Sequence, residues 1–190
     1  MKTIQTTTQG ILAALLLILV VLPACSESTN SEKETSKQEI PVVDIHTAVF
    51  QGDLNAVKQH IDAGSDLNIK EPMSGSTPLI SAITFNNFEI AKALVEAGAD
   101  LSSKNNDGST ALHSAAFFCR KKMVQMLLDA NADKTIKNNY DATPREIVTA
   151  PFEVIKPAYE MIQAQLGPMG VVIDMDYLEK TRPVIADMLR

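Results

Sequence analysis

The stretch "GSTPLISAITFNNFEIAKALVEAGADLSSKNND", residues 75–107, decides the fold, because the chain carries it more than once. It returns 33 residues later as "GSTALHSAAFFCRKKMVQMLLDANADKTIKNNY", residues 108–140, and a diverged copy precedes it at residues 43–70. That earlier copy is offset by 34, so one extra residue lies within "NIKEPMSGST", residues 68–77. A fourth, degenerate copy begins with "DATPREIV" at Asp141. Such a period is typical of proteins built from stacked structural repeats.

The pattern within one unit predicts two short helices. Asn86 lies between them, where the first copy has Gly52, and both residues tolerate a left-handed backbone. Gly98 has the position of a C-cap and Pro78 that of a first helical turn. One unit cannot bury its apolar faces alone, so we expect an all-α solenoid of about four helix-turn-helix repeats. The apolar residues at helical spacing are Leu79, Ala82 and Ile83, then Ile90, Ala91, Leu94 and Val95.

The segments "GSTPLISA", "GSTALHSAA" and "LVEAGADL" resemble ankyrin repeats, whose signature is T-P-L-H-x-A-A with a later G-A-D. The resemblance covers about residues 42–150. The third copy departs from it, with Ala111 for the Pro, Cys119 for the inter-helix Gly and Asn131 for the second Gly. The first copy lacks T-P-L, as expected of an N-terminal capping repeat. The resemblance implies a scaffold that binds other proteins.

The C-terminal part of the chain is less regular. We interpret "FEVIKPAYEMIQAQL", residues 152–166, as the second helix of a final capping repeat, so that the repeat domain spans residues 42–166. The sequence "GPMG" then interrupts the helix. Residues 167–190 form a C-terminal extension with a helix in "MDYLEKTRPVIADMLR". That helix either closes the end of the solenoid or docks a partner.

Residues 1–24 have the layout of a secretory signal peptide. The run "ILAALLLILVVL" contains twelve apolar residues, whereas a membrane-spanning helix needs about 20. It ends in "LPAC", which resembles the lipobox of bacterial lipoproteins, although Pro23 is a less usual middle residue. The resemblance implies that Cys25 is lipidated and anchors the chain in a bacterial cell envelope. Ser26 resembles the class sorted to the outer membrane, facing the periplasm. The alternatives are an uncleaved anchor or a plain signal peptide.

Residues 25–41 separate this signal from the repeats. After the cysteine they read "SESTNSEKETSKQEIP", in which Ile40 is the one large apolar residue. Such a composition buries too little surface to offset the entropy lost on ordering. It predicts a disordered tether, with a solvated helix as the alternative.

The composition and motifs indicate no catalytic function. A formal net charge of −6 disfavours nucleic acid as a partner, because phosphate binding needs many cations. His46 and His113 share one repeat position, where the resemblance implies bonds to the backbone between repeats, and His60 lies in a predicted helix. We therefore expect no metal, cofactor, small-molecule substrate or enzyme activity; a metal protein or enzyme built on the repeats is the less favoured alternative. With Cys25 lipidated, Cys119 has no disulfide partner and is expected to be sheltered.

Aromatic residues are the candidates for partner binding. Four Phe residues lie in the two positions between the A-A site of the first helix and the inter-helix Gly site, and the resemblance to ankyrin repeats implies that these positions border the concave groove. Large apolar groups on a surface are unusual, and aromatic residues are favoured binding anchors. The alternative is packing between repeats or beneath the C-terminal extension. Tyr140 lies at a predicted finger tip, where turn chemistry does not require it. The Phe residues are Phe50, Phe85, Phe117 and Phe118.

Together these features predict a membrane-tethered protein–protein interaction module. The partner would bind along the concave face. An alternative within the same class is a periplasmic protector or inhibitor of an enzyme or toxin. Function in such scaffolds resides in the grafted surface, so the repeats alone do not name the partner.

Overall fold

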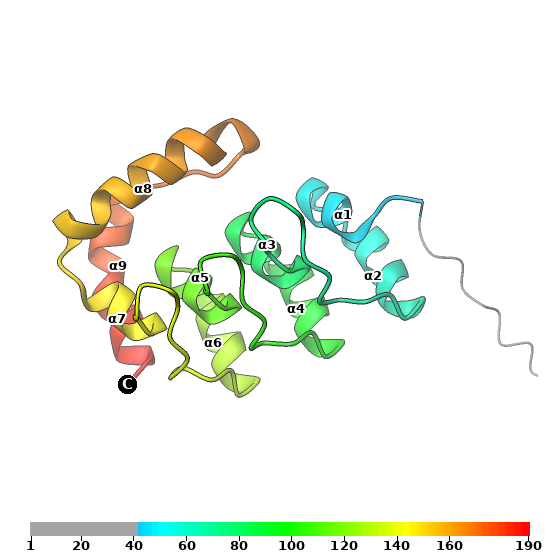
Figure 1. Cartoon of the computed structure of the whole chain (residues 1–190), viewed down its shortest axis with the longest axis horizontal. Coiled ribbons are helices and arrows are strands. Elements are labelled where there is room, and N and C mark those ends of the chain that lie inside the picture. Colours follow the sequence, from blue (N-terminus) through cyan, green and yellow to red (C-terminus); the bar gives the residue numbers. More distant parts are fainter. Residues whose placement is uncertain (1–41) are drawn as a thin grey trace, which may run out of the picture. The chain divides into compact units, whose positions relative to one another are not determined.

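The computed structural model describes residues 42–190, and regular structure in this range is entirely helical (Figure 1). The signal peptide, Cys25 and the tether predicted for residues 1–41 lie outside the described residues. The helices are α1 (Ile45–Gln51), α2 (Leu54–Asp62), α3 (Pro78–Thr84), α4 (Phe88–Glu96), α5 (Ala111–Phe117), α6 (Lys121–Asp129), α7 (Pro144–Thr149), α8 (Phe152–Leu166), the 3-10 helix η1 (Gly167–Met169) and α9 (Met175–Met188).

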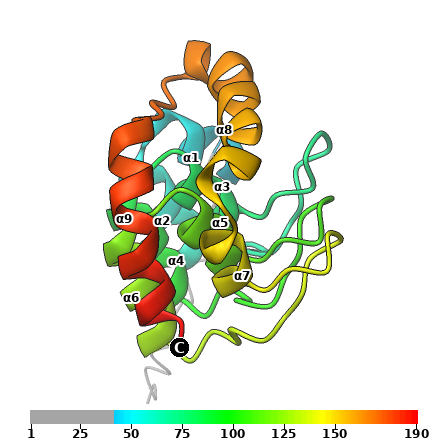
Figure 2. The same cartoon turned by 90° about the vertical axis from the view of Figure 1, so that its left-hand side faces the viewer.

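The helices stack in two layers. One layer runs α1, α3, α5, α7, and the other runs α2, α4, α6, α9, with each helix packed on the next (Figures 1 and 2). The loops between units project to one side as fingers (Figure 2). The predicted all-α solenoid of about four repeats is confirmed. No helix within residues 42–190 has the length and apolar content needed to cross a bilayer.

A threonine begins the first helix of three successive units. Thr77 Oγ1 accepts a hydrogen bond from the Ile80 N–H at 3.4 Å. Thr143 Oγ1 likewise accepts a hydrogen bond from the Glu146 N–H at 3.3 Å. In return, the Glu146 carboxylate accepts a hydrogen bond from the Thr143 N–H at 2.7 Å. In the middle unit, His113 Nδ1 replaces the carboxylate and accepts from the Thr110 N–H at 3.2 Å. These caps satisfy N–H groups that a helix leaves unpaired, which explains the spacing of 33 residues between the threonines.

The backbone of the repeat is kept where the typical glycine is lost. Gly52 has φ 72° between α1 and α2, and at the equivalent positions Asn86 has φ 61° and Cys119 has φ 51°. Asn131 has φ 61° where the previous repeat has a glycine. A left-handed residue with a side chain costs about 1–2 kcal/mol. Stacking of the neighbouring repeats therefore imposes this conformation at Cys119.

The fingers are joined by a ladder of asparagines. The Asn106 N–H donates to Ser74 O at 2.9 Å, and the Asn139 N–H donates to Asp107 O at 2.9 Å. The side-chain amide of Asn106 donates to Met73 O at 3.0 Å, and that of Asn139 donates to Asn106 O at 2.9 Å. These bonds hold adjacent fingers in register, so the asparagines contribute more than turn formation.

The extra residue of the first repeat lies at a finger tip. In the first finger the Glu71 N–H donates to Ser76 O, five residues on, at 3.0 Å. In the second finger the Asn105 N–H donates to Ser109 O, four residues on, at 3.0 Å. The first finger is thus one residue longer, within the segment that the offset of 34 predicted.

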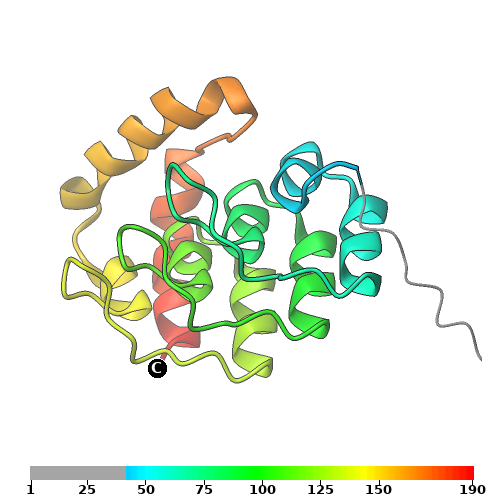
Figure 3. The ribbon, with the colours of Figure 1, turned by 45° about the vertical axis from the view of Figure 1, so that its right-hand side comes forward.

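The fourth repeat differs from the prediction. The second helix of this repeat is α9, which packs against α7 and α6, whereas α8 leaves the stack and extends along one end of the first helices (Figures 1 and 3). The assignment of residues 152–166 to that position was wrong, because α9 offers more surface for burial. Tyr159 is the one residue of α8 in the buried core, whereas α9 and the residue after it supply Leu178, Ile185, Ala186 and Leu189. Hence α8 is an insertion within the last repeat, and the helix in 167–190 closes the solenoid.

Candidate protein-interaction surface

Two of the predicted aromatic residues form an exposed pair in adjacent repeats. Phe50 lies in the last turn of α1 and Phe85 directly follows α3. Their ring centroids are 5.3 Å apart in an edge-to-face arrangement, which is a favourable geometry for aromatic rings. Phe50 is 46% exposed, and Phe85 is partly buried. This N-terminal pair is an apolar group on the surface of the described residues.

The second aromatic pair is covered. The rings of Phe117 and Phe118 are 5.1 Å apart, and Tyr159 from α8 lies 4.3 Å from Phe117. Phe118 is only 7% exposed, so its prediction as a partner-binding residue is wrong because its ring belongs to the core. Phe117 is partly buried under Tyr159. The packing alternative therefore holds for Phe118, whereas Phe117 is partly buried, as Phe85 is, and partner contact by Phe117 stays a prediction.

Polar bonds fix α8 over the covered pair. Tyr159 Oη donates to Phe117 O at 2.7 Å and accepts from Arg182 at 3.2 Å. Burial raises the pKa of Tyr159 to about 12, so the phenol stays neutral. Arg182 is 3% exposed and also donates to Ile147 O at 3.0 Å and Ala150 O at 2.5 Å, where α7 ends. A cation at this helix end is favourable, because unpaired carbonyls and the helix dipole attract it.

Tyr140 lies at the tip of the third finger. It is 75% exposed, and its hydroxyl is 3.5 Å from a carboxylate oxygen of Asp107. The turn uses the Tyr140 N–H, which donates to Asn138 Oδ1 at 3.0 Å, but makes no demand on the ring. Partner contact by Tyr140 stays a prediction.

The three histidines bond to backbone carbonyls. The distances from Nε2 are 3.0 Å to Ile69 O for His46, 2.8 Å to Val43 O for His60 and 3.0 Å to Ala142 O for His113. His113 thereby links its repeat to the next, as the resemblance implied. Residues 42–190 contain no group of three or more His, Cys, Asp or Glu side chains placed to hold a metal ion.

The protonation of His113 is expected to make stability depend on pH. Burial lowers the pKa of His113 below its usual 6.5, so the unfolded chain binds a proton that the folded chain excludes. Stability is then highest above pH 6.5 and falls as the pH drops from 7 towards 5. The variant His113→Gln should cost about 1 kcal/mol at pH 7.5 and flatten this decline, as measured by urea unfolding at each pH. An unchanged slope in the variant would contradict the assignment.

Cys119 is a sheltered thiol. It is fully buried, and its sulfur is 3.9 Å from Leu178 O. Burial raises the pKa of the Cys119 thiol to about 11, so almost no thiolate exists near neutral pH. The thiol is therefore a small core group and a poor nucleophile.

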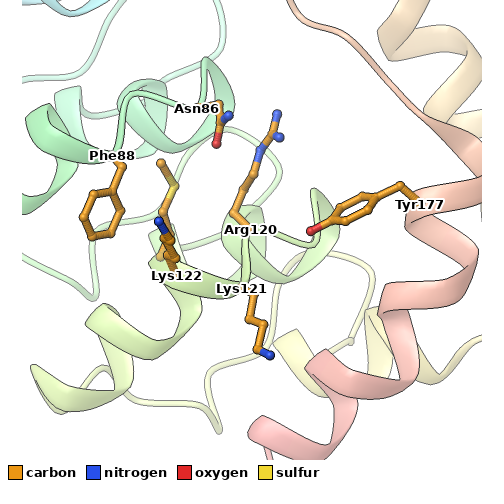
Figure 4. Close-up of a pocket in the computed structure, with 7 residues that line it drawn as sticks. Asn86, Phe88, Arg120, Lys121, Lys122 and Tyr177 are labelled. Carbon is orange, nitrogen blue, oxygen red and sulfur yellow. The ribbon is translucent and has the colours of Figure 1, made fainter.

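A hollow at the turns between the paired helices was not predicted. It has a volume of about 370 Å³, and Arg120, Lys121 and Lys122 line it at the start of α6 (Figure 4). The "RKK" run at residues 120–122 was the available signal. The sequence did not show that it faces residues from two other elements. These other lining residues are Asn86, Phe88, Met123 and Tyr177.

The repeated hairpins match a known family. The family model "Ankyrin repeats (3 copies)" matches residues 45–138. These residues are ankyrin repeats. Ankyrin repeats typically serve protein–protein interaction and are typically not enzymes. The match ends before α7, so the repeat that contains the α8 insertion lies beyond the matched ankyrin segment.

Other ankyrin proteins share part of this chain. "DNA-binding protein RFXANK" from Homo sapiens is 34% identical over 76 residues, which are 38% of this chain and 29% of that protein. "Putative ankyrin repeat protein R664" from Acanthamoeba polyphaga mimivirus is 28% identical over 85 residues, 45% of this chain and 52% of that one. The ankyrin repeat domain of Bcl-3, titled "a unique member of the IkappaB protein family", superposes with a TM-score of 0.53 at 30% identity, covering 54% of this chain and 45% of that one. The chain thus spans about half or less of each relative.

Proposed function

We propose that this protein binds a partner protein along the face formed by the first helices, with Phe50 and Phe85 as anchors. The exposed N-terminal pair is the observation that carries the proposal. Ankyrin repeats typically serve protein–protein interaction, and aromatic side chains dominate the binding energy of many interfaces. Because the repeats are rigid, binding loses little conformational entropy.

The two aromatic pairs differ in what covers them. In the repeat register Phe117 corresponds to Phe50 and Phe118 to Phe85, yet Tyr159 packs on Phe117 and Phe118 is only 7% exposed. The N-terminal pair has no such cover within residues 42–190, and Phe50 remains 46% exposed. Apolar surface of this kind is stabilised by contact with another protein, at about 25 cal/mol for each Å² buried. A partner that buries Phe50 and Phe85 would therefore shield these rings from water, as Tyr159 shields Phe117.

The proposal includes a tether. The "LPAC" sequence resembles a lipobox, and the polar residues 25–41 would link a lipidated Cys25 to the repeats. Two or more acyl chains hold a protein firmly at a membrane. The module would then face the periplasm from the outer membrane, and its partner would be an envelope protein.

Crosslinking in intact cells tests the partner proposal. Phe50 is replaced by the photoreactive p-benzoylphenylalanine, and the same residue is placed at Gln59 on the exposed side of α2 as a control. We expect a specific crosslinked protein from position 50 and not from position 59. Adding Phe85→Ser should reduce this product about tenfold or more, because it removes half of the anchor. The variant Cys25→Ser should move the protein out of the membrane fraction.

The controls separate binding from packing. Melting temperatures are measured for each variant, since Phe85 also contacts its own repeat. If Phe85→Ser lowers the melting temperature but leaves crosslinking at position 50 unchanged, the N-terminal pair is a packing feature and the proposal fails. Equal capture from positions 50 and 59 would also contradict it.

A further inference from the structure

The hollow beside α6 gathers positive charge in an otherwise acidic protein. Arg120, Lys121 and Lys122 are consecutive and line the same space, and no acidic residue of the described chain lines it (Figure 4). The whole chain has a net charge of −6. The ion pairs within residues 42–190 lie elsewhere and do not involve these three cations. The positive charge of the hollow is therefore unbalanced within the described fold.

Folding does not explain these cations. The partial positive charge at the start of a helix favours acidic residues and disfavours basic ones. The other second helices follow this rule, since Asp53 caps α2 and Glu89 lies in the first turn of α4. Helix α6 instead begins with Lys121 and Lys122, both exposed, after an Arg120 that makes no side-chain cap. This arrangement is mildly unfavourable for the helix, and an anion bound in the hollow would offset it.

Arg120 is held in a position that suits an anionic ligand. Its guanidinium carbon lies 5.8 Å from the centre of the Phe118 ring, and its Nε is buried without a hydrogen-bond partner among the described residues. Tyr177 forms the opposite wall, with its hydroxyl donating to Cys119 O at 3.3 Å (Figure 4). Arg120 as a whole is only partly buried, and a charge-assisted hydrogen bond from its guanidinium to a carboxylate would be stronger than a neutral one.

The hollow adjoins the N-terminal pair. Phe85 belongs to that pair, and Asn86, the next residue, lines the hollow. The aromatic pair and the basic hollow are therefore adjacent along the chain at the turn between α3 and α4. We propose that the hollow binds acidic side chains of the same partner segment whose apolar side chains cover Phe50 and Phe85. This inference rests on the proposed function and adds the chemistry of the partner, an extended segment with acidic and apolar residues side by side.

A peptide fits this site better than a membrane or a nucleic acid. Three cations are too few for tight binding to a polyanion, whose affinity grows with each neutralised phosphate. An anionic bilayer would repel the acidic remainder of the protein. The hollow also has an apolar lining from Phe88 and Met123, which matches mixed side chains rather than phosphates alone.

A comparative selection tests the inference. A phage library of random twelve-residue peptides is selected on the full chain, purified in a neutral detergent. Three variants are used in parallel: Lys121→Glu with Lys122→Glu, Phe50→Ser with Phe85→Ser, and the control Lys58→Glu with Lys70→Glu, two exposed lysines away from the hollow. We expect wild type and control to enrich peptides that combine Asp or Glu with large apolar residues. Synthetic copies should bind the Lys121/Lys122 variant about tenfold more weakly, and 0.5 M NaCl should remove this difference.

Each outcome is decisive. Peptides that need the phenylalanines but show no acidic bias, or that bind the Lys121/Lys122 variant as tightly as wild type, overturn this inference and leave the proposed function intact. Peptides indifferent to Phe50→Ser with Phe85→Ser, or no enrichment at all, contradict both proposals. If phosphatidylglycerol vesicles sediment wild type and control but not the Lys121/Lys122 variant, while acidic peptides do not bind, the site is a lipid site and the inference fails.

Discussion

The variant Arg182→Met is expected to lower the free energy of unfolding by about 3 kcal/mol. Methionine is close to arginine in length, so the change chiefly removes hydrogen bonds from a side chain that is 3% exposed. Three acceptors lose their donor: Ile147 O, Ala150 O and Tyr159 Oη. Bonds from charged donors contribute about 1.5–3 kcal/mol each but are not additive, and a buried carbonyl left unpaired is costly.

The loss should be local in the stack. Arg182 connects α9 with the end of α7, so hydrogen exchange should accelerate in α7–α9 and change little in α1–α4. Guanidinium unfolding gives the overall change. Lys180→Met on the same helix is the matched control, since Lys180 is exposed and should shift stability by less than about 0.5 kcal/mol. Equal effects of the two variants would show that the Arg182 bonds contribute nothing.

The second large effect is expected from Tyr159→Ala. This ring is completely buried and stacks on Phe117 at 4.3 Å, with Phe152 at 6.1 Å. Removing such a ring costs about 3–5 kcal/mol. Since Tyr159 is the fully buried residue of α8, the variant should also detach α8 and expose Phe117. Binding of an apolar dye should rise at temperatures where the repeats remain folded.

Tyr159→Phe separates the ring from its hydroxyl. It keeps the stacking and loses the bonds to Phe117 O and from Arg182, so about 1 kcal/mol is expected, without a rise in dye binding. If Tyr159→Ala leaves dye binding at the wild-type level, α8 is held by other contacts and does not cover the second pair through this ring.

The repeats could be predicted because their information is local and recurrent. Thr77, Thr110 and Thr143 recur every 33 residues, each begins a helix, and each copy supports the interpretation of the others. Gly52 and Asn86 predict a left-handed residue between the two helices of each repeat, and Cys119, at the equivalent position of the third copy, also has a positive φ. Periodicity thus compensates for weak signals in any single copy.

The last repeat and the hollow depend on contacts that have no local signature. Both α8 and α9 carry apolar residues at helical spacing and an internal proline, so the sequence favoured the nearer one as the partner of α7. What decides the choice is the larger number of α9 residues that become buried against α6 and α7, which no local pattern shows. The hollow likewise needs Asn86 and Tyr177 beside the "RKK" run, and only the folded chain brings them together.

Because the chain is synthesised from its N-terminus, the α8 insertion delays completion of the fourth repeat. The first three hairpins can form one after another during synthesis. The fourth hairpin has only its first helix, α7, until α8, η1 and then α9 have been synthesised. During that delay the apolar surfaces of α5, α6 and α7 that α8 and α9 later bury remain exposed to water. Newly made molecules are therefore expected to pass through an interval in which the apolar end of the stack is exposed to chaperones and proteases.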